Sequence, residues 1–165
     1  MSALLERPAV VRVRAALAAA GSAAEVIVLA DTARTAQDAA DSVGVELGAI
    51  VKSLVFAVDG RAVMALVAGD RRCDTAALAR ALGLDGTIGR ADADMVRDAT
   101  GFTIGGVPPI AHAQPVAVLI DASLARFDTL YAAAGHPHCV FATSLEELVG
   151  LTGAPVIEGL GIGEG

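Results

Sequence analysis

Two neighbouring apolar stretches joined by Asp59-Gly60 constrain the fold of this chain more than any other feature. Residues 50–58 read Ile-Val-Lys-Ser-Leu-Val-Phe-Ala-Val, and residues 61–68 read Arg-Ala-Val-Met-Ala-Leu-Val-Ala. Asp-Gly is favoured in tight hairpin turns, because both residues tolerate a positive φ. The sequence therefore predicts an antiparallel β-hairpin whose strands are apolar enough to be covered on both faces.

The segments around this hairpin alternate between helical and extended patterns. Each expected helix has a capping residue before it or a glycine after it, and the helices cover residues 10–20, 35–44, 74–82, 92–100 and a segment from Ser144. Short apolar runs predict strands over residues 25–30 (interpreted as buried), 116–121, 130–134 and 139–143. The pattern indicates a single α/β (α+β) domain over residues 1–158, with a central mixed β-sheet flanked by helices. The Gly-rich tail, residues 159–165, is expected to be flexible.

Charge and composition limit what such a domain binds. The chain has 165 residues, enough for one domain with its own core, and 55% of them are hydrophobic. Its 19 acidic residues outnumber its 12 basic residues, which argues against a broad nucleic-acid surface, because such surfaces neutralise phosphates. One Tyr, four Phe and no Trp make a poor stacking platform for single strands. We therefore expect that an RNA substrate would be held tightly only over a small part.

The sequence contains no signal for membrane or export. No segment reaches the roughly 18 unbroken apolar residues of a membrane helix. The first eight residues contain a charge pair and a proline where a secretion signal needs an apolar run. Cys73 and Cys139 are too few and too far apart to suggest a disulfide framework. We expect a cytoplasmic protein without a membrane partner.

Lys52 is the only lysine of the chain, and every other basic residue is an arginine. The alternation of side chains along a strand puts Lys52 on the same face as Ile50, Leu54 and Phe56. An ammonium group there loses hydration, which suits a point charge aimed at a phosphate or a developing oxyanion. The alternative interpretation is an edge-strand lysine that extends to water.

The second candidate feature is the loop Gly105-Gly106-Val107-Pro108-Pro109. Its glycines let the backbone approach a ligand closely, and its prolines hold the loop rigid. Such a loop can recognise a small amine or hydroxyl through fixed backbone groups. A stiff surface turn is the alternative interpretation.

The run His136-Pro137-His138-Cys139 contains three metal-ligand side chains. His-x-His-Cys matches no closed zinc spacing, and His112 and Cys73 lie far away in sequence, so we expect no metal site. Cys139 heads an apolar strand, a poor setting for a nucleophile. A histidine that lines a pocket as a hydrogen-bonding group is the better interpretation. Asp121 ends a predicted buried strand, where polar side chains often face a pocket.

Taken in order, these segments resemble the YbaK family, which includes the editing domain inserted in bacterial prolyl-tRNA synthetases. The resemblance runs from about Val10 to Glu158, which is nearly the whole chain. The loop at residues 105–109 matches the Gly-x-x-x-Pro signature of the family. The other matching segments are Thr35–Ala40, Ile50–Phe56, Gly69-Asp70, Thr100-Gly101-Phe102, Ile120-Asp121, Ala133-Ala134-Gly135 and Leu145–Leu151.

The resemblance implies a freestanding deacylase that hydrolyses the ester between a wrong amino acid and the 3′ end of a tRNA, here tRNA-Pro. It implies that Lys52 supplies a positive charge near the terminal adenosine, and that the backbone of Gly105–Pro109 holds the α-amino group. Water would attack with help from the substrate's own ribose hydroxyl, without metal or cofactor. The partners would be mischarged tRNA and, as a candidate, prolyl-tRNA synthetase. Further substrate-binding positions are Thr35, Ser53, His112, Asp121 and Gly135.

The chain departs from the family at Ala111, where many relatives carry glycine, and at its three histidines. The amino acid that is removed stays open between alanine, cysteine, serine, threonine and proline analogues. Two other functions stay open as well. One is a non-catalytic binding module, a partner of a synthetase or another protein. The other is a small-molecule hydrolase that uses Cys139.

Overall fold

The predicted hairpin forms the centre of the structure, a computed structural model that describes residues 3–30, 33–84 and 88–163. Strands β2 (Ile50–Val58) and β3 (Arg61–Ala68) pair antiparallel along their whole length. Asp59 and Gly60 have φ values of 49° and 77°, the positive values that a tight hairpin turn requires. The hairpin prediction is therefore confirmed.

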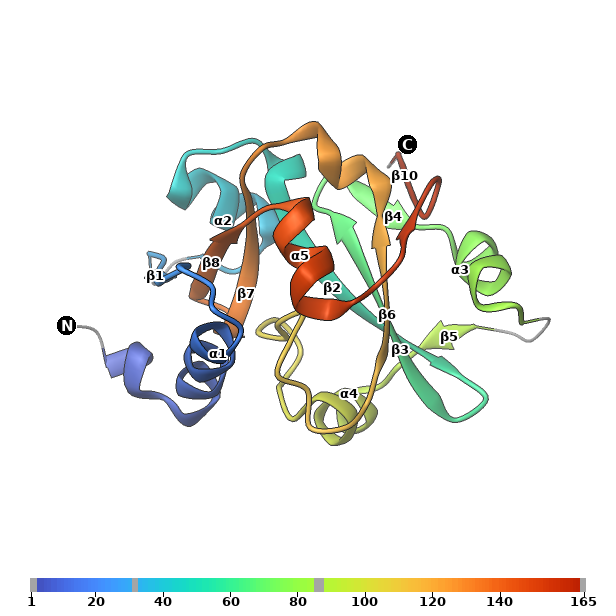
Figure 1. Ribbon diagram of the computed structural model, residues 1–165, viewed down its shortest axis with the longest axis horizontal. Helices are drawn as coiled ribbons and strands as arrows, with labels where there is room; N and C mark the ends of the chain where they lie inside the picture. The colour runs from blue at the N-terminus through green and yellow to red at the C-terminus, as the bar shows by residue number, and fades with distance from the viewer. Residues whose placement is uncertain (1–2, 31–32, 85–87, 164–165) are drawn as a thin grey trace.

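Strands on both sides extend this hairpin into a mixed sheet, which confirms the predicted fold class. Strands β2 and β7, β3 and β6, and β6 and β9 are parallel, and the other pairs are antiparallel. Among the described residues the sheet has eight strands (Figure 1). Its order is β1 (Val26–Val28), β8 (Cys139–Thr143), β7 (Leu130–His136), β2, β3, β6 (Ala117–Asp121) and β9 (Val156–Ile157), with β5 (Gly89–Arg90) beside β2.

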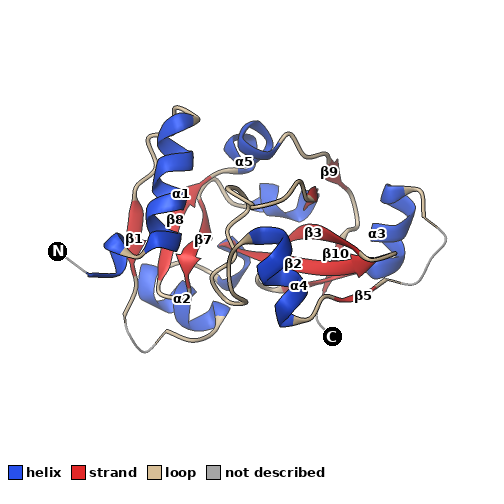
Figure 2. Ribbon diagram, turned by 90° about the horizontal axis from the view of Figure 1, so that it is seen from below, coloured by secondary structure: helices blue, strands red, loops and turns tan. Residues whose placement is uncertain are grey.

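Helices cover both faces of the sheet. On one face, side chains of α1 (Pro8–Ala19), α4 (Ala93–Thr100) and α5 (Leu145–Thr152) enter the largest buried cluster. On the other face, α2 (Ala36–Val43) and α3 (Thr75–Leu82) pack into two smaller clusters. Figure 2 shows α1 and α5 on one side of the sheet and α2 on the opposite side. No helix in the described part of the chain is long and apolar enough to cross a bilayer. Short 3-10 helices span Ala3–Glu6, Leu47–Ala49 and Ala122–Arg126.

The predicted caps set the ends of the helices. Thr35 accepts the backbone N–H of Asp38, and the Asp38 carboxylate accepts the backbone N–H of Thr35, which forms a capping box before α2. Side chains also cap the first turns of α3, α4 and α5. Left-handed glycines end four helices: Gly44, Gly83, Gly101 and Gly153. These boundaries are local, which is why the sequence predicts them well.

Two strand predictions need correction. The strand at residues 26–28 is not buried, since it lies at the edge of the sheet and Ile27 is 38% exposed. Strand β7 continues through Gly135 to His136, so the turn before β8 is formed by Pro137-His138 rather than by Gly135-His136-Pro137.

The prediction of a flexible tail from Gly159 is wrong for the described residues. Leu160 is fully buried, and strand β10 (Gly161–Gly163) pairs antiparallel with β4 (Arg71–Cys73). The folded domain therefore extends beyond the predicted boundary at residue 158. A buried leucine and a backbone ladder hold a segment that is otherwise mostly glycine.

Candidate active site at a fork in the sheet

Strands β2 and β7 separate inside the sheet, and the gap between them is the candidate site. They pair in parallel only where Ile50 and Val51 lie opposite Tyr131 and Ala132. Beyond this point β2 stays beside β3, whereas β7 follows β8. A cavity of about 480 Å³ lies at this fork. Ligands of α/β sheets bind where neighbouring parallel strands diverge at their carboxyl ends, and the volume suits a small-molecule site.

The cavity brings together several of the predicted site residues. Of these, Thr35, Lys52, Ser53, Gly105 and Val107 line it. The other described lining residues come from α2, β2, β5, α4, β7, β8 and the loops beside these elements, and were not predicted as site residues. They include Arg34, Ala36, Ala39, Leu54, Arg90, Val96, Ile104, Tyr131, Ala133, Pro137 and Val140.

Lys52 lies on the predicted face of β2. Together with Leu54 and Phe56 it lines a second groove of about 420 Å³ that borders the cavity. Its side chain is half-buried, and Nζ donates a hydrogen bond to the backbone carbonyl of Arg71. The interpretation as an edge-strand lysine is wrong, because β2 lies between β3 and β7. Lys52 therefore lies between the two hollows, and the exposed Arg90 lines both of them as well.

Ser53 turns its backbone toward the fork. The Ile50 carbonyl accepts the Gly69 N–H on the β3 side, and the Val55 carbonyl accepts the Ala91 N–H on the opposite edge. Because backbone direction alternates along a strand, Ser53 points its N–H and C=O to the same edge as Val55. The ladder with β7 has ended before Ser53. Its Oγ is also buried and makes no hydrogen bond within the described residues.

The Gly105–Pro109 loop presses against the end of β7. The N–H of Gly135 donates to the carbonyl of Gly106 at 2.9 Å. A Cβ on Gly106 would lie 2.9 Å from the backbone N of His136, and one on Gly135 would lie 2.7 Å from the Ala9 carbonyl oxygen. Real Cβ atoms do not approach so closely, so both positions need glycine. The interpretation as a free surface turn is therefore excluded, since residues 106–110 are buried.

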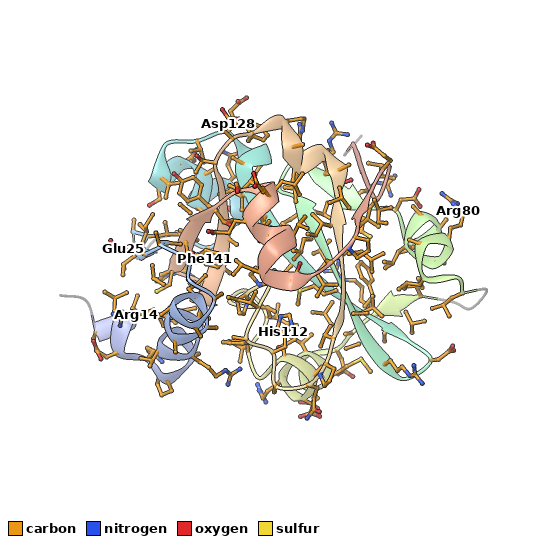
Figure 3. All side chains as sticks on the ribbon, viewed as in Figure 1. Arg14, Glu25, Arg80, His112, Asp128 and Phe141 are labelled. Carbon is orange, nitrogen blue, oxygen red and sulfur yellow. The ribbon has the colours of Figure 1, made fainter. Side chains whose placement is uncertain are left out.

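His112 and Arg12 support this loop and the residues that flank it, on the side away from the cavity. His112 Nε2 lies 2.8 Å from the Pro108 carbonyl oxygen, and Figure 3 shows His112 between α1 and α4. Burial lowers the pKa of His112, and the charge of Arg12 lowers it further. Arg12 donates to the carbonyl of Thr100 at 3.1 Å and lies 4.1 Å from the ring centre of Phe102. Arg12 lies on the exposed side of its helix, and no local signal in the sequence indicates that its guanidinium contacts Thr100 and Phe102.

Ala111 explains one departure from the family pattern. Its φ is 67°, in the left-handed region that glycine adopts at little cost. A glycine at this position would avoid that strain. Five predicted site residues position the loop and do not face the cavity, since they are not among its lining residues. These are Gly106, Pro108, Pro109, His112 and Gly135.

Asp121 does not lie in the cavity. It is almost completely buried, and its Oδ2 accepts a hydrogen bond from Ser123. Gly161 packs directly on this carboxylate, since a Cβ on Gly161 would lie 2.3 Å from Oδ2. The structure therefore places Asp121 beneath β10.

The electrostatic character of the cavity is cationic. Its described lining carries Arg34, Lys52 and Arg90 but no carboxylate, histidine or cysteine. Burial raises the pKa of the Cys139 thiol, and this side chain is completely inside the core. A thiolate at Cys139 is therefore unfavourable, which argues against the cysteine-dependent hydrolase. Among the residues described, no group of three or more His, Cys, Asp or Glu could hold a metal ion.

Comparison with known proteins identifies the family. The model of the aminoacyl-tRNA editing domain matches residues 30–151, which contain the fork, the lysine strand and the Gly/Pro loop. The chain belongs to this family. As an editing-domain protein, it has the mixed α/β fold expected from the resemblance.

Individual relatives agree with this assignment. The chain is 34% identical over 115 residues to the uncharacterised protein YwhH of Bacillus subtilis (strain 168), which covers 69% of this chain and 72% of YwhH. It is 36% identical over 76 residues to a proline–tRNA ligase of Maridesulfovibrio salexigens, but this match spans 46% of the chain and 13% of the ligase. A crystal structure of a proposed trans-editing enzyme for prolyl tRNA synthetase superposes with a TM-score of 0.87 at 40% identity. That superposition covers 96% of this editing-domain chain and 98% of the other.

Proposed function

We propose that this editing-domain protein hydrolyses the ester of mischarged aminoacyl-tRNA in trans, in the cytoplasm, and that tRNA-Pro is its substrate. The single observation that carries the proposal is the fork cavity, where the lone lysine and the rigid Gly/Pro loop meet in one small space. The likeness to a proposed trans-editing enzyme and to a proline–tRNA ligase supports the choice of tRNA.

In this proposal the cationic rim receives the 3′ end of the tRNA. Lys52 supplies a compact positive charge for the terminal phosphate or for the oxyanion that develops on the ester. The exposed side chains of Arg34 and Arg90 add positive charge at the same cavity. Because the protein as a whole carries a net charge of −7, this rim confines the attraction for RNA to one place.

The amino acid enters the apolar part of the fork. Gly105 and Val107 form one wall, and the open edge of Ser53 forms the other. The Ser53 hydroxyl lacks a hydrogen bond within the described structure, and a polar group of the aminoacyl ester would satisfy it. Backbone groups of the loop hold the α-amino group in the same way.

Water attack in this cavity uses the substrate's own chemistry. The described lining offers no carboxylate, histidine or cysteine as a general base. The ribose hydroxyl adjacent to the ester is close enough within the substrate itself to orient or deprotonate a water molecule. Lys52 then stabilises the negative charge of the tetrahedral intermediate, and the tRNA hydroxyl leaves with a proton.

The test is deacylation of tRNA-Pro that has been mischarged with alanine, cysteine or serine. The rates are compared between the wild type and Lys52→Ala. We expect the wild type to hydrolyse at least one ester and Lys52→Ala to lose at least about 100-fold in rate. Circular dichroism and thermal unfolding check that the variant is folded. Full activity of Lys52→Ala would contradict the proposal. Hydrolysis of none of the esters would favour a non-catalytic binding module.

A further inference from the structure

The C-terminal segment is built into the domain next to Lys52. Leu160 is fully buried in a cluster with Val67, Leu78 and Leu119. The next residue, Gly161, passes so close to Asp121 that any Cβ would collide with the carboxylate. These two residues fix where β10 begins. The segment therefore has a defined position, although its sequence is mostly glycine.

The register of β10 decides which way the backbone of β4 points. The N–H of Asp74 donates to the Leu160 carbonyl at 2.7 Å, and Ile162 lies opposite Arg72. Hydrogen-bonded pairs occur at every second position of an antiparallel ladder, so the next such pair is Ile162 with Arg72. Arg71 therefore directs its own carbonyl to the other edge of β4, away from β10. This is the carbonyl that accepts the hydrogen bond from Lys52 Nζ.

We propose that β10 is a positioning element for the active-site lysine, because its pairing with β4 holds the Arg71 carbonyl that receives the Lys52 ammonium. The inference rests on the proposed function, in which Lys52 is the active-site cation. A lysine stem has many rotamers, and a fixed acceptor selects those that keep the charge at the cavity. Lys52 is the catalytic residue, and Arg71 and Ile162 act through it.

The two ends of β4 are held differently. Before the strand, the Asp70 carboxylate forms a bidentate ion pair with the Arg126 guanidinium, with N–O distances of 2.8 and 3.0 Å. That pair fixes the entry into β4 from the side of the 3-10 helix that spans residues 122–126. The strand itself, from Arg71 to Cys73, pairs with β10. Loss of β10 should therefore free the strand without unfolding the sheet.

The test compares Ile162→Pro with Ile162→Ala. Proline removes the N–H that pairs with Arg72, whereas alanine keeps it and shortens only the side chain. Because Lys52 is the only lysine in the sequence, protein labelled with ¹³C,¹⁵N-lysine gives one Cε–Nζ signal in an NMR spectrum that detects the end of the lysine side chain. We expect Ile162→Pro to shift or broaden this signal and to lower kcat about ten-fold with little change in KM. Ile162→Ala should resemble the wild type in its lysine NMR signal and in its kcat.

An unchanged lysine signal in a folded Ile162→Pro protein would overturn the proposal. If Ile162→Pro does not fold, a chain that ends after Gly161 replaces it, with a chain that ends after Gly163 as its control. The NMR signal is independent of any substrate. If the wild type deacylates nothing, the proposed function fails, but the signal still decides whether β10 positions Lys52.

Discussion

The two edges of β2 are built in opposite ways. Along one edge, β3 stays paired from Val51 opposite Ala68 to Val58 opposite Arg61. Along the other edge, β7 pairs at two positions and then leaves. The complete ladder holds β2 rigid, and the incomplete ladder leaves a gap beside that rigid strand. A functional site on a strand is placed more accurately than one on loops alone.

The side chains on the two sides of this part of β2 also differ in polarity. Opposite Ser53, on the complete edge, lies Leu66, which is fully buried. Opposite Lys52 lies Val67, which is also fully buried. Position by position, apolar residues of β3 support polar residues of β2. Substitutions on the β3 side should therefore affect stability, and substitutions at the fork should affect activity.

The largest expected effects are a loss of stability in Leu66→Ala and a loss of deacylation in Lys52→Ala, and the two variants are compared directly. Leu66→Ala leaves a cavity in the core and should lower the free energy of unfolding by about 2–5 kcal/mol, measured by urea denaturation. Below its unfolding transition it should retain nearly wild-type kcat. Lys52→Ala should show the reverse, with a normal urea midpoint and the loss of deacylation described above. Equal losses of stability in both variants would break the comparison between the edges.

Gly106→Ala should give an intermediate effect, because it pushes the Gly/Pro loop away from β7. The added Cβ would lie 2.9 Å from the His136 backbone, so either the loop or the strand must move. We expect deacylation to fall about ten-fold and the free energy of unfolding to fall by about 1–3 kcal/mol. Gly150→Ala, where a Cβ meets nothing within 4 Å, is the matched control. Wild-type kinetics in Gly106→Ala would show that the loop does not shape the cavity.

Ser53→Ala should give the smallest effect. Unlike Leu66→Ala and Gly106→Ala, it should not lower the free energy of unfolding. It removes a buried hydroxyl that makes no hydrogen bond among the described residues. The free energy of unfolding should stay the same or rise by up to about 1 kcal/mol, while deacylation falls several-fold. Urea denaturation and steady-state kinetics on one preparation test both. A drop in stability would mean that the hydroxyl supports the fold and not the substrate.

The sequence predicted those parts of the fold that local signals determine. Asp59-Gly60 set the hairpin, and side chains such as Thr35 and Ser144 set the helix starts, because each acts within a few residues. Strand β10 escaped prediction because the high glycine content of Gly-Leu-Gly-Ile-Gly indicates a flexible tail, even though Leu160 and Ile162 alternate with the glycines. Its position depends on where Leu160 finds a pocket, which only the tertiary structure provides.

The candidate site was predicted in part for a similar reason. Lys52 stood out because it is the only lysine, and the Gly/Pro loop stood out by composition. The fork itself was not predictable, because it depends on where two distant parallel strands stop pairing. Asp121 ends its strand as expected but lies beneath β10, so its position at a strand end did not reveal which cavity it would face.

The separation of β2 from β7 has a consequence for how the molecule forms. Strands β2 and β3 are joined by a two-residue turn, so their ladder closes early and at small entropic cost. Strand β7 follows much later in the chain, and its parallel pairing with β2 must close a long loop. Until β7 arrives, β5 covers the second edge of β2 only at Phe56 and Ala57, and the start of this apolar strand is open to any other extended chain. The strand that carries Lys52 therefore presents an unpaired edge during folding, which is a risk of aggregation.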